Sequence, residues 1–331
     1  MKFKDFVGID VSKHTLDVFI LNVKVHKQFK NERLGFQQLE QWVQRQTCLA
    51  LSDLLLCFEH TGLYSLSLAQ FLEEKRVLYA MVPALEIKRS MGITRGKNDR
   101  IDSRRIAEFA FRFLDKIRLT TLPAKEILNI QHMLNLRERM ARNLAGYIVS
   151  KHEIRSVFHA EELPHMFSCY DTMICTLKHE IKLLEKSIRE ILHGNKELWT
   201  TFELITTIKG IGLIVASHLI VYTCNFTRFD NWRKFACYSG TAPFEYQSGT
   251  SVRGRTQVSQ IANQQMKKLL HLAAICAIHT DTEIRAYYQR RLDEGKSRMT
   301  VINIVRNKLL ARVFAVAKRG TPFVDIKKYV A

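Results

Sequence analysis

The first part of the chain has the alternating and clustered apolar residues that are typical of β-strands. In residues 5–21, DFVGIDVSKHTLDVFIL, an apolar run leads to Asp10, a short polar turn follows at 12–14, and the strand pattern resumes over 15–21. This pattern predicts a β-hairpin with Asp10 near its open end.

A further strand is indicated by the run DLLLCF at residues 53–58, which has the length of a buried strand. Glu59 is the last member of this run before the turn residues Thr61 and Gly62. The pattern therefore predicts that the Glu59 carboxylate lies at the carboxyl end of a strand.

The pattern changes to helical periodicity in residues 97–113, KNDRIDSRRIAEFAFRF. The apolar residues recur at the spacing of one helix face: Ile101, Ile106, Phe109, Ala110 and Phe113. Asp99 and Asp102 are three positions apart, so both carboxylates face the same way, one turn apart. The other polar residues of this helix are mostly basic, and we therefore expect that the two carboxylates do not belong to a salt-bridged face.

Two long helices are predicted in the middle of the chain, separated by a stretch that contains His residues and Pro164. The second has a heptad seam at Ile174, Leu177, Ile181, Leu184, Ile188 and Ile191. The first nearly repeats this seam, with Arg137 intruding, at Ile127, Ile130, Leu134, Ala141, Leu144 and Ile148. Such helices can pair within one chain or between chains, and so short a seam does not choose between the two.

A helix that runs through residues 204–209 is interrupted by Gly210 and Gly212 and resumes at Leu213. Glycines let backbone N–H groups approach a phosphate at the amino end of the new helix, and Lys209 adds positive charge beside them. This arrangement is typical of a helix-hairpin-helix that binds the nucleic-acid backbone without reading bases. A plain turn between two helices is the alternative.

The following loop, residues 238–259, is rich in Gly, Ser and Thr, and it has Arg253 and Arg255 close to Ser248. A serine followed by glycine in a basic loop can approach a phosphodiester, and arginines can hold the phosphate oxygens. Three amphipathic helices are predicted beyond the loop, near 263–279, 282–293 and 299–317. Their basic faces include Lys267, Lys268, Arg290, Arg291, Arg306, Lys308 and Arg312, most of them expected to be solvated and some to contact nucleic acid.

Charge strengthens the indication of a polyanionic partner. The 331 residues include 51 Lys and Arg against 32 Asp and Glu, a net charge of +19. Residues 200–331 contribute +12 of this excess, whereas residues 1–122 contribute +6 and residues 123–199 only +1. Ribosomal and membrane-surface proteins can be equally basic, so charge alone does not name the partner.

Cysteine usage and hydropathy indicate the cell compartment in which the protein works. The seven cysteines are an odd number without a Cys-x-x-Cys pair, a pattern that argues against structural zinc. The absence of a secretory segment predicts a reducing cytosol, and no apolar run approaches the ~20 residues that span a bilayer.

The four carboxylates Asp10, Glu59, Asp99 and Asp102 suggest a metal site. Strand-end carboxylates that face a helical pair form an oxygen-rich site, and Mg²⁺ prefers carboxylates together with phosphate oxygens. Two such ions about 3.5–4 Å apart clamp the attacking and leaving oxygens of a phosphodiester. A cation also relieves the mutual repulsion of the carboxylates. Asp17 and Asp53 fall outside the pattern, and we expect ordinary surface or capping roles for them.

Several blocks resemble the DEDD transposases of bridge-RNA-guided insertion sequences, which are related to the Piv DNA invertases. The resemblance lies in GIDVSK around Asp10, FEHTGLY around Glu59, and KNDRIDSRRIAEF around Asp99 and Asp102. It continues in LITTIKGIGLIVASHLI and FACYSGTAPFEYQSG, which are similar to the carboxyl-terminal transposase domain of that family. The blocks span nearly the whole chain.

The resemblance implies a fold of mixed α/β and all-α domains: an RNase H-like (RuvC-like) domain at 1–122, a helical coiled-coil segment at 123–199, and a mainly α-helical domain with a helix-hairpin-helix at 200–331. It implies a recombinase that holds Mg²⁺, or Mn²⁺ in its place, at the four carboxylates. It further implies that Ser248 is the nucleophile, with Ser251 as the fallback, and that the partners are donor and target DNA, a structured guide RNA and further copies of the chain as a dimer or tetramer.

The chain departs from the family pattern at three places. Ile261-Ala262 stands where Lys-Gly is common, Ser103 replaces an alanine after Asp102, and Lys209 stands where proline is usual. Three alternatives stay open: a Piv-like invertase at fixed inverted sites, a Holliday-junction endonuclease that uses water in place of Ser248, and a basic scaffold that uses neither the carboxylates nor the serine.

Overall fold

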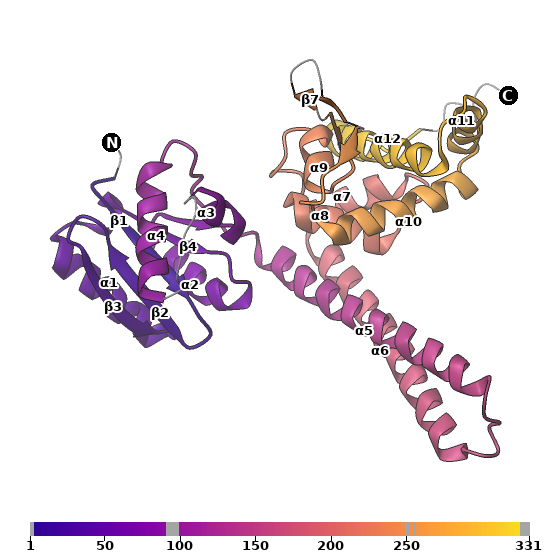
Figure 1. Cartoon of the computed structure of the whole chain (residues 1–331), viewed down its shortest axis with the longest axis horizontal. Coiled ribbons are helices and arrows are strands. Elements are labelled where there is room, and N and C mark those ends of the chain that lie inside the picture. Colours follow the sequence, from indigo (N-terminus) through magenta and orange to yellow (C-terminus); the bar gives the residue numbers. More distant parts are fainter. Residues whose placement is uncertain (1–2, 91–98, 246, 249–251, 255, 325–331) are drawn as a thin grey trace. The chain divides into compact units, whose positions relative to one another are not determined.

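The structure is a computed structural model that describes residues 3–90, 99–245, 247–248, 252–254 and 256–324. It divides into two compact units, residues 1–122 and 123–331, shown in Figure 1 from indigo to yellow. The predicted domain bounds of 1–122 and 200–331 stay predictions. Whether residues 123–199 behave as a domain of their own stays a prediction.

The first unit is built on a five-stranded mixed sheet with the strand order β3-β2-β1-β4-β5. β1, β2 and β3 are antiparallel neighbours, whereas β4 and β5 run parallel to β1. This order is consistent with the RNase H-like fold that the resemblance implied. The strands span Asp5–Val11 (β1), Thr15–Ile20 (β2), Val25–Lys30 (β3), Leu54–Glu59 (β4) and Tyr79–Val82 (β5).

Helices cover both faces of this sheet because its strands present apolar side chains alternately to each side. One core packs the sheet against α1 and α2, and a second core packs the opposite face against α3 and α4. Figure 1 shows α4 lying along the sheet. The helices span Arg33–Thr47 (α1), Leu63–Glu74 (α2), Ala84–Ser90 (α3) and Asp99–Arg112 (α4), with a 3₁₀ turn (η1) at Leu51–Asp53.

The predicted hairpin is formed by β1 and β2, but the expectation that Asp10 lies near its open end is wrong. Asp10 is paired with Asp17, and the next pair, Val11 with Leu16, is the last before the turn. Asp10 therefore lies at the closed end of the hairpin, one residue before the end of β1 and next to the turn. The strand ending at Glu59 is confirmed, and so is the helix predicted within residues 97–113, which spans Asp99–Arg112.

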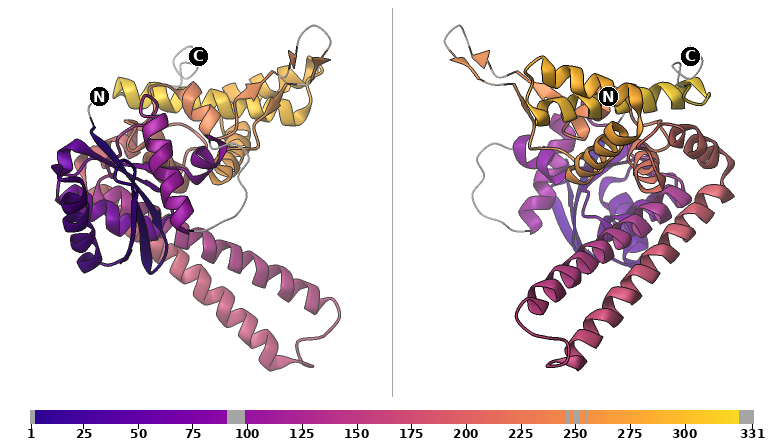
Figure 2. Two further views of the ribbon diagram at one scale, coloured as in Figure 1. Left: turned by 60° about the vertical axis from the view of Figure 1, so that its left-hand side comes forward. Right: turned by 90° about the vertical axis from the view of Figure 1, so that its right-hand side faces the viewer.

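The second unit begins with the two long helices that the heptad pattern predicted, α5 (Lys125–Arg155) and α6 (Pro164–Gly194). They pack side by side within one chain, as both views of Figure 2 show. The intruding Arg137 of α5 forms an ion pair with Glu185 of α6, with 2.7 Å between nitrogen and oxygen. No helix within the described residues is long and apolar enough to cross a membrane.

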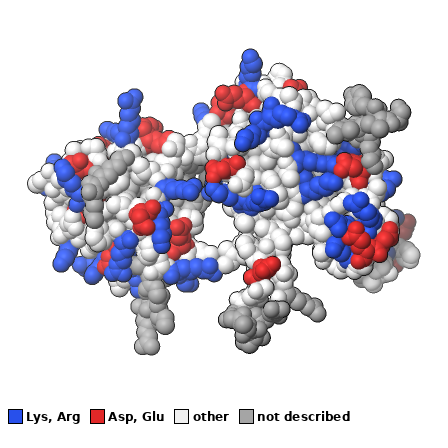
Figure 3. Space-filling view, turned by 90° about the horizontal axis from the view of Figure 1, so that it is seen from above, with Lys and Arg blue, Asp and Glu red and all other residues white. Residues whose placement is uncertain are grey.

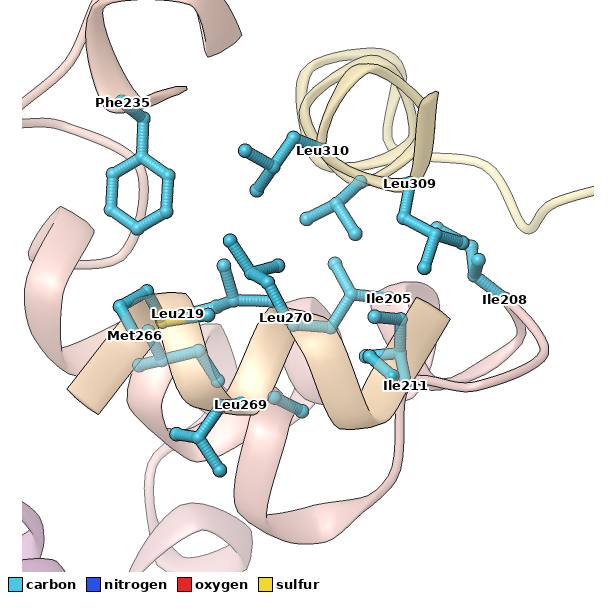
Figure 4. Close-up of a cluster of buried hydrophobic side chains, with 14 of the residues drawn as sticks. Ile205, Ile208, Ile211, Leu219, Phe235, Met266, Leu269, Leu270, Leu309 and Leu310 are labelled. Atoms are coloured by element: carbon cyan, nitrogen blue, oxygen red, sulfur yellow. The ribbon is translucent and has the colours of Figure 1, made fainter. Parts of the chain in front are cut away.

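The remaining helices of this unit surround one large apolar core. Figure 4 shows part of it, where Leu270 of α10 and Leu309 and Leu310 of α12 lie against Ile205 and Leu219. The start of α5 and the end of α6 also contribute buried residues to this core, including Ile130 and Ile188. The helices span Lys196–Thr206 (α7), Leu213–Thr223 (α8), Trp232–Tyr238 (α9), Gln264–Thr280 (α10), Thr282–Asp293 (α11) and Arg298–Arg319 (α12).

Four two-residue strands lie between α9 and α10. β6 (Pro243–Phe244) pairs with β9 (Gln257–Val258), and β7 (Gln247–Ser248) pairs with β8 (Val252–Arg253), both antiparallel. We call residues 243–258 the serine hairpin. It projects from the helical body of the second unit in Figures 1 and 2.

Candidate metal centre and serine hairpin

Gly8 lets α4 approach the sheet closely enough to bring its first turn beside Asp10. A Cβ atom at Gly8 would lie 2.1 Å from the Ser103 backbone oxygen and 2.3 Å from the Ala107 backbone nitrogen. Ser103 and Ala107 are themselves small and buried. The Ser103 hydroxyl donates to the Arg100 backbone oxygen of its own helix at 3.0 Å, so serine is accommodated where the family has alanine.

Gly8→Ala is expected to destabilise the first unit by about 1–3 kcal/mol, because the added methyl group would overlap backbone atoms that cannot rotate away. Urea unfolding followed by circular dichroism measures this change. The matched control is Gly146→Ala in the middle of α5, where nothing lies within 4 Å of the new methyl group and helix propensity improves. Equal stability of Gly8→Ala and the unmodified chain would contradict the close packing described above.

Three of the four predicted carboxylates meet at one place. Asp10 is the penultimate residue of β1, while Asp99 and Asp102 lie in the first turn of α4. Each offers one oxygen atom, and these three atoms lie within 4.8 Å of one another. Hard cations bind such oxygen-rich groups, so the donor chemistry fits a divalent ion.

The electrostatics of Asp10 also fit a cation site. Burial and the nearby charges of Asp99, Glu59 and Asp102 together raise the pKa of Asp10 to about 6, with burial the largest cause. A bound cation would offset both effects, because it favours the ionised carboxylate.

Glu59 lies near Asp10, on the neighbouring parallel strand. Ile9 of β1 is paired with Phe58 of β4, so the next residues along the two strands are Asp10 and Glu59. The Glu59 charge is among the causes that raise the pKa of Asp10. Among the described residues, however, the three oxygens that lie within 4.8 Å of one another belong to Asp10, Asp99 and Asp102.

Asp17 was wrongly expected to have an ordinary surface or capping role. Its residue is only 6% exposed, and it faces Asp10 across the hairpin. Its two oxygens accept hydrogen bonds from His26 Nε2 and Gln28 Nε2 of β3, each at 2.9 Å. Asp17 therefore adds negative charge beside Asp10 while its own oxygens are held toward β3. The pairing register of β1 with β2, which the sequence did not specify, places Asp17 next to Asp10.

Arg105 is a second residue that the sequence reasoning missed. Its Nη1 donates to Asp102 Oδ1 at 2.8 Å, and both side chains are partly buried. The expectation that neither helical carboxylate is salt-bridged is therefore wrong for Asp102. The spacing of three residues between Asp102 and Arg105 was the available signal. Because one Asp102 oxygen is held by this arginine, the orientation of the carboxylate is restricted.

The serine hairpin brings two of the predicted residues into one register. Ser248 ends β7 and is paired with Val252, while Gln247 beside it is paired with Arg253 of β8. Arg253 is thus one step along the ladder from Ser248. Arg255 and the fallback Ser251 lie outside the described residues.

The turn between α7 and α8 contains the predicted Lys209, Gly210 and Gly212. Gly210 has a φ of +92°, and a Cβ there would lie 2.5 Å from the Ala273 backbone oxygen of α10, so packing within the protein already requires this glycine. Gly212 is exposed, precedes the first turn of α8, and has nothing within 4 Å of a built Cβ. The open part of this turn is therefore at Gly212.

The basic faces predicted for the last three helices are partly neutralised within the protein. Lys308 and Arg312 form ion pairs with Glu283, and Arg312 also pairs with the buried Asp281. On the face drawn in Figure 3, Lys and Arg side chains are interspersed with Asp and Glu side chains. Lys268 is exposed and Lys267 partly buried.

The helical pattern placed Arg306 on an exposed basic face, and this prediction is wrong. The residue is only 7% exposed, and its guanidinium contacts His271 of α10 and Asn303 of its own helix. Close packing of α10 against α12 places it inside, because the helix face that carries it is covered by a neighbour that the sequence alone could not identify.

Comparisons with known proteins match two separate parts of the chain, and the first match extends past the end of the first unit. Residues 7–159 match the IS110 DEDD model, described as a transposase, and residues 202–289 match the transposase IS116/IS110/IS902 family. The pilin gene-inverting proteins of Moraxella bovis and Moraxella lacunata are each 26% identical over 327 residues, covering 97% of this chain and 98% of each relative.

A protein of insertion element IS110 from Streptomyces coelicolor, described as an uncharacterized 43.6 kDa protein, is 29% identical over 118 residues. That match covers 36% of this chain and 29% of the relative. Both transposase domains of the IS110 family are thus present in one chain, in the order in which the carboxylate site and the serine hairpin occur, and the chain is a DNA transposase or recombinase of that family.

Proposed function

We propose that this chain cuts and rejoins DNA strands through Ser248, with the help of a divalent cation held by Asp10, Glu59, Asp99 and Asp102. The observation that carries the proposal is the meeting of three carboxylate oxygens within 4.8 Å on an RNase H-like sheet, in a chain whose second unit matches a transposase family. The reaction is phosphoryl transfer between DNA strand ends.

The four carboxylates would hold Mg²⁺ or Mn²⁺, and the bound ion would supply positive charge for the oxygens of the scissile phosphate. The chain's own residues then have separate tasks. Asp17 and Arg105 act on the ligands: Asp17 adds negative charge beside Asp10, and Arg105 orients Asp102 through their 2.8 Å hydrogen bond.

Ser248 would supply the nucleophile from the serine hairpin. Its hydroxyl loses a proton and forms an oxygen–phosphorus bond, while the bond from phosphorus to one deoxyribose oxygen breaks and that strand end leaves as a hydroxyl. The other strand end stays esterified to Ser248. Attack by a new hydroxyl reverses the step, so that strands are rejoined without an external energy source. Arg253 and Arg255 are proposed to hold the phosphate oxygens.

Other residues are proposed to hold the nucleic-acid backbone. Lys209, Gly210 and Gly212 would offer positive charge and the open amino end of α8, in the manner of a helix-hairpin-helix. Lys267 and Lys268 would add phosphate contacts at the start of α10. These contacts position a strand without reading its bases.

A structured guide RNA and self-association complete the proposal, both from the family resemblance. Self-association is supported by apolar side chains exposed on the helical pair, such as Leu136 and Val149 of α5 and Leu183 of α6, which are 44–55% exposed. These side chains would pack against another copy of the chain, as a dimer or tetramer.

A Piv-like invertase is the second candidate, favoured by the end-to-end similarity to the two pilin gene-inverting proteins. Such an enzyme would act at fixed inverted sites without a guide. The two candidates share the carboxylates and Ser248, so only the nucleic-acid partner separates them.

The experiment that separates the two candidates is to purify the full-length chain and sequence the nucleic acid that copurifies with it. The chain is expressed in cells that also carry the DNA flanking its gene. We expect one discrete RNA, and we expect that digesting it with ribonuclease removes DNA recombination by the purified complex. The same digestion in the presence of a ribonuclease inhibitor is the control. Recombination at fixed sites that survives digestion would favour the invertase and exclude guidance by RNA.

A further inference from the structure

The chain that leads into the serine hairpin is held at Thr241, just after α9. Thr241 is fully buried, and Asn303 and Asn307 of α12 each donate a side-chain hydrogen bond to its backbone oxygen at 2.9 Å. The Thr241 hydroxyl donates in turn to Asn307 Oδ1 at 3.2 Å. One helix therefore holds this residue by three hydrogen bonds.

Further partners orient both asparagine amides. Arg306 Nη1 donates to Asn303 Oδ1 at 3.4 Å, and Asn307 Nδ2 also donates to the Asn303 backbone oxygen at 3.0 Å. Each amide oxygen thus faces a donor, which directs both amino groups toward the Thr241 carbonyl. Rotating either amide by half a turn would bring oxygen against oxygen.

The chain that leaves the hairpin is held in a similar way at Asn263. Its backbone nitrogen donates to the Tyr238 backbone oxygen at 2.8 Å, and its Nδ2 donates to the Tyr238 hydroxyl at 2.9 Å. Its Oδ1 accepts from the Met266 backbone nitrogen and so caps α10. Both ends of residues 242–262 are therefore tied to the helical body through asparagine side chains.

We propose that Asn303 and Asn307, together with Asn263, are positioning residues that fix the base of the serine hairpin. The proposal rests on the proposed function of Ser248, whose oxygen must reach about 3–3.5 Å from phosphorus with the correct alignment. The two-residue strands of the hairpin give it little stability of their own, so its orientation depends on its ends. The packing of α12 does not need the two amides, because Leu309 and Leu310 already bury its apolar face in the core.

The test uses the full-length chain with Asn303→Ala and Asn307→Ala combined, and each change alone. Alanine favours a helix more than asparagine does, so α12 itself is not weakened by the substitution. Asn195→Ala is the matched control, because Asn195 caps α7 through hydrogen bonds to Glu197 and Leu198 and is remote in sequence from the hairpin. Its loss lowers stability without touching Thr241.

Two measurements are made on each variant. The first is the ¹⁹F line width of trifluoromethyl-phenylalanine placed at Phe244 in β6, with a second probe at the exposed Phe158 as a reference. The second is the rate of covalent protein–DNA adduct formation at saturating DNA. In the double variant we expect a narrower line at Phe244 only, and an adduct rate lower by roughly 10–100-fold, since a displacement of about 1 Å can cost that much. DNA affinity should stay within about twofold of the unmodified chain.

An unchanged Phe244 line together with an unchanged adduct rate in the double variant would overturn the proposal. The same changes in Asn195→Ala would overturn it too, because they would then reflect general loss of stability. If the unmodified chain forms no adduct, the proposed function of Ser248 fails, and the Phe244 line width alone still decides whether the asparagines hold the hairpin.

Discussion

Asp10→Asn is expected to abolish DNA strand cleavage in the presence of Mg²⁺, while the variant folds as well as the unmodified chain. The pKa of Asp10 is raised by burial and by the charges of Asp99, Glu59 and Asp102, which a bound cation would offset. An amide cannot supply the anionic oxygen that a hard cation prefers. Cleavage of a labelled DNA substrate over a range of Mg²⁺ concentrations measures the effect.

The same variant is also expected to change how the stability of the metal-free chain depends on pH. In the metal-free chain the pKa of Asp10 is about 6, against 3.8 for the ordinary carboxyl, so between these values the folded state binds more protons than the unfolded state. The contribution of the protonated Asp10 carboxyl to the free energy of unfolding is thus fully present below pH 3.8, and it is lost as the pH rises through about 6. The full shift corresponds to about 3 kcal/mol, which partial solvent exposure reduces to an expected 1–2 kcal/mol.

Asp10→Asn should remove this dependence and be as stable as the unmodified chain, or more stable, at pH 7 without metal. Thermal unfolding at pH 5 and pH 7, with and without Mg²⁺, tests both statements, and Mg²⁺ should raise the Tm of the unmodified chain more than that of the variant. Asp53→Asn is the control, because Asp53 pairs with Lys4 at 2.8 Å and is not one of the clustered carboxylates. Near-normal cleavage by Asp10→Asn would remove Asp10 from the metal site.

Ser248→Ala is expected to eliminate the covalent protein–DNA adduct while leaving nucleic-acid binding unchanged. The hydroxyl is the only group lost, and alanine adds no bulk beside Val252, the backbone partner of Ser248. The adduct is measured with end-labelled DNA on a denaturing gel after quenching, and binding is measured separately on the same DNA at fixed salt.

Ser251→Ala is the matched control, since Ser251 is the alternative serine of the same loop. Adduct lost in Ser251→Ala but retained in Ser248→Ala would move the nucleophile to Ser251. If Ser248→Ala and Ser251→Ala both cut DNA at the normal rate without forming an adduct, the enzyme uses water and is an endonuclease.

The sequence predicted the elements that carry the carboxylates because the signals are local. The run that ends at Glu59 and the apolar spacing that follows Asp99 each span only a few residues, and β-strand and helix periodicities are legible at that length. The two long helices, α5 and α6, were predicted for the same reason. The family resemblance supplied the RNase H-like fold and the role of Ser248, which no spacing in the chain required.

Residues whose role depends on a distant neighbour were misjudged. Asp17 became a buried neighbour of Asp10 through the hairpin register, whereas the ion pair of Asp102 with Arg105 is local, three residues along the same helix. Arg306 was assigned to a basic face, although α10 covers it. In each case the deciding contact lies on another element or depends on a side-chain orientation that periodicity does not describe.

By itself, then, the sequence determined the strand that ends at Glu59, the helix that carries Asp99 and Asp102, and the two long helices, because backbone periodicity follows from neighbouring side chains. Only the tertiary structure decided that Gly8 admits α4 against the sheet, so that Asp99 and Asp102 meet Asp10, and that Asn303 and Asn307 hold Thr241 at the base of the serine hairpin. These contacts join residues 60 or more positions apart. Their geometry results from close packing, in which a single Cβ atom decides whether two elements can touch.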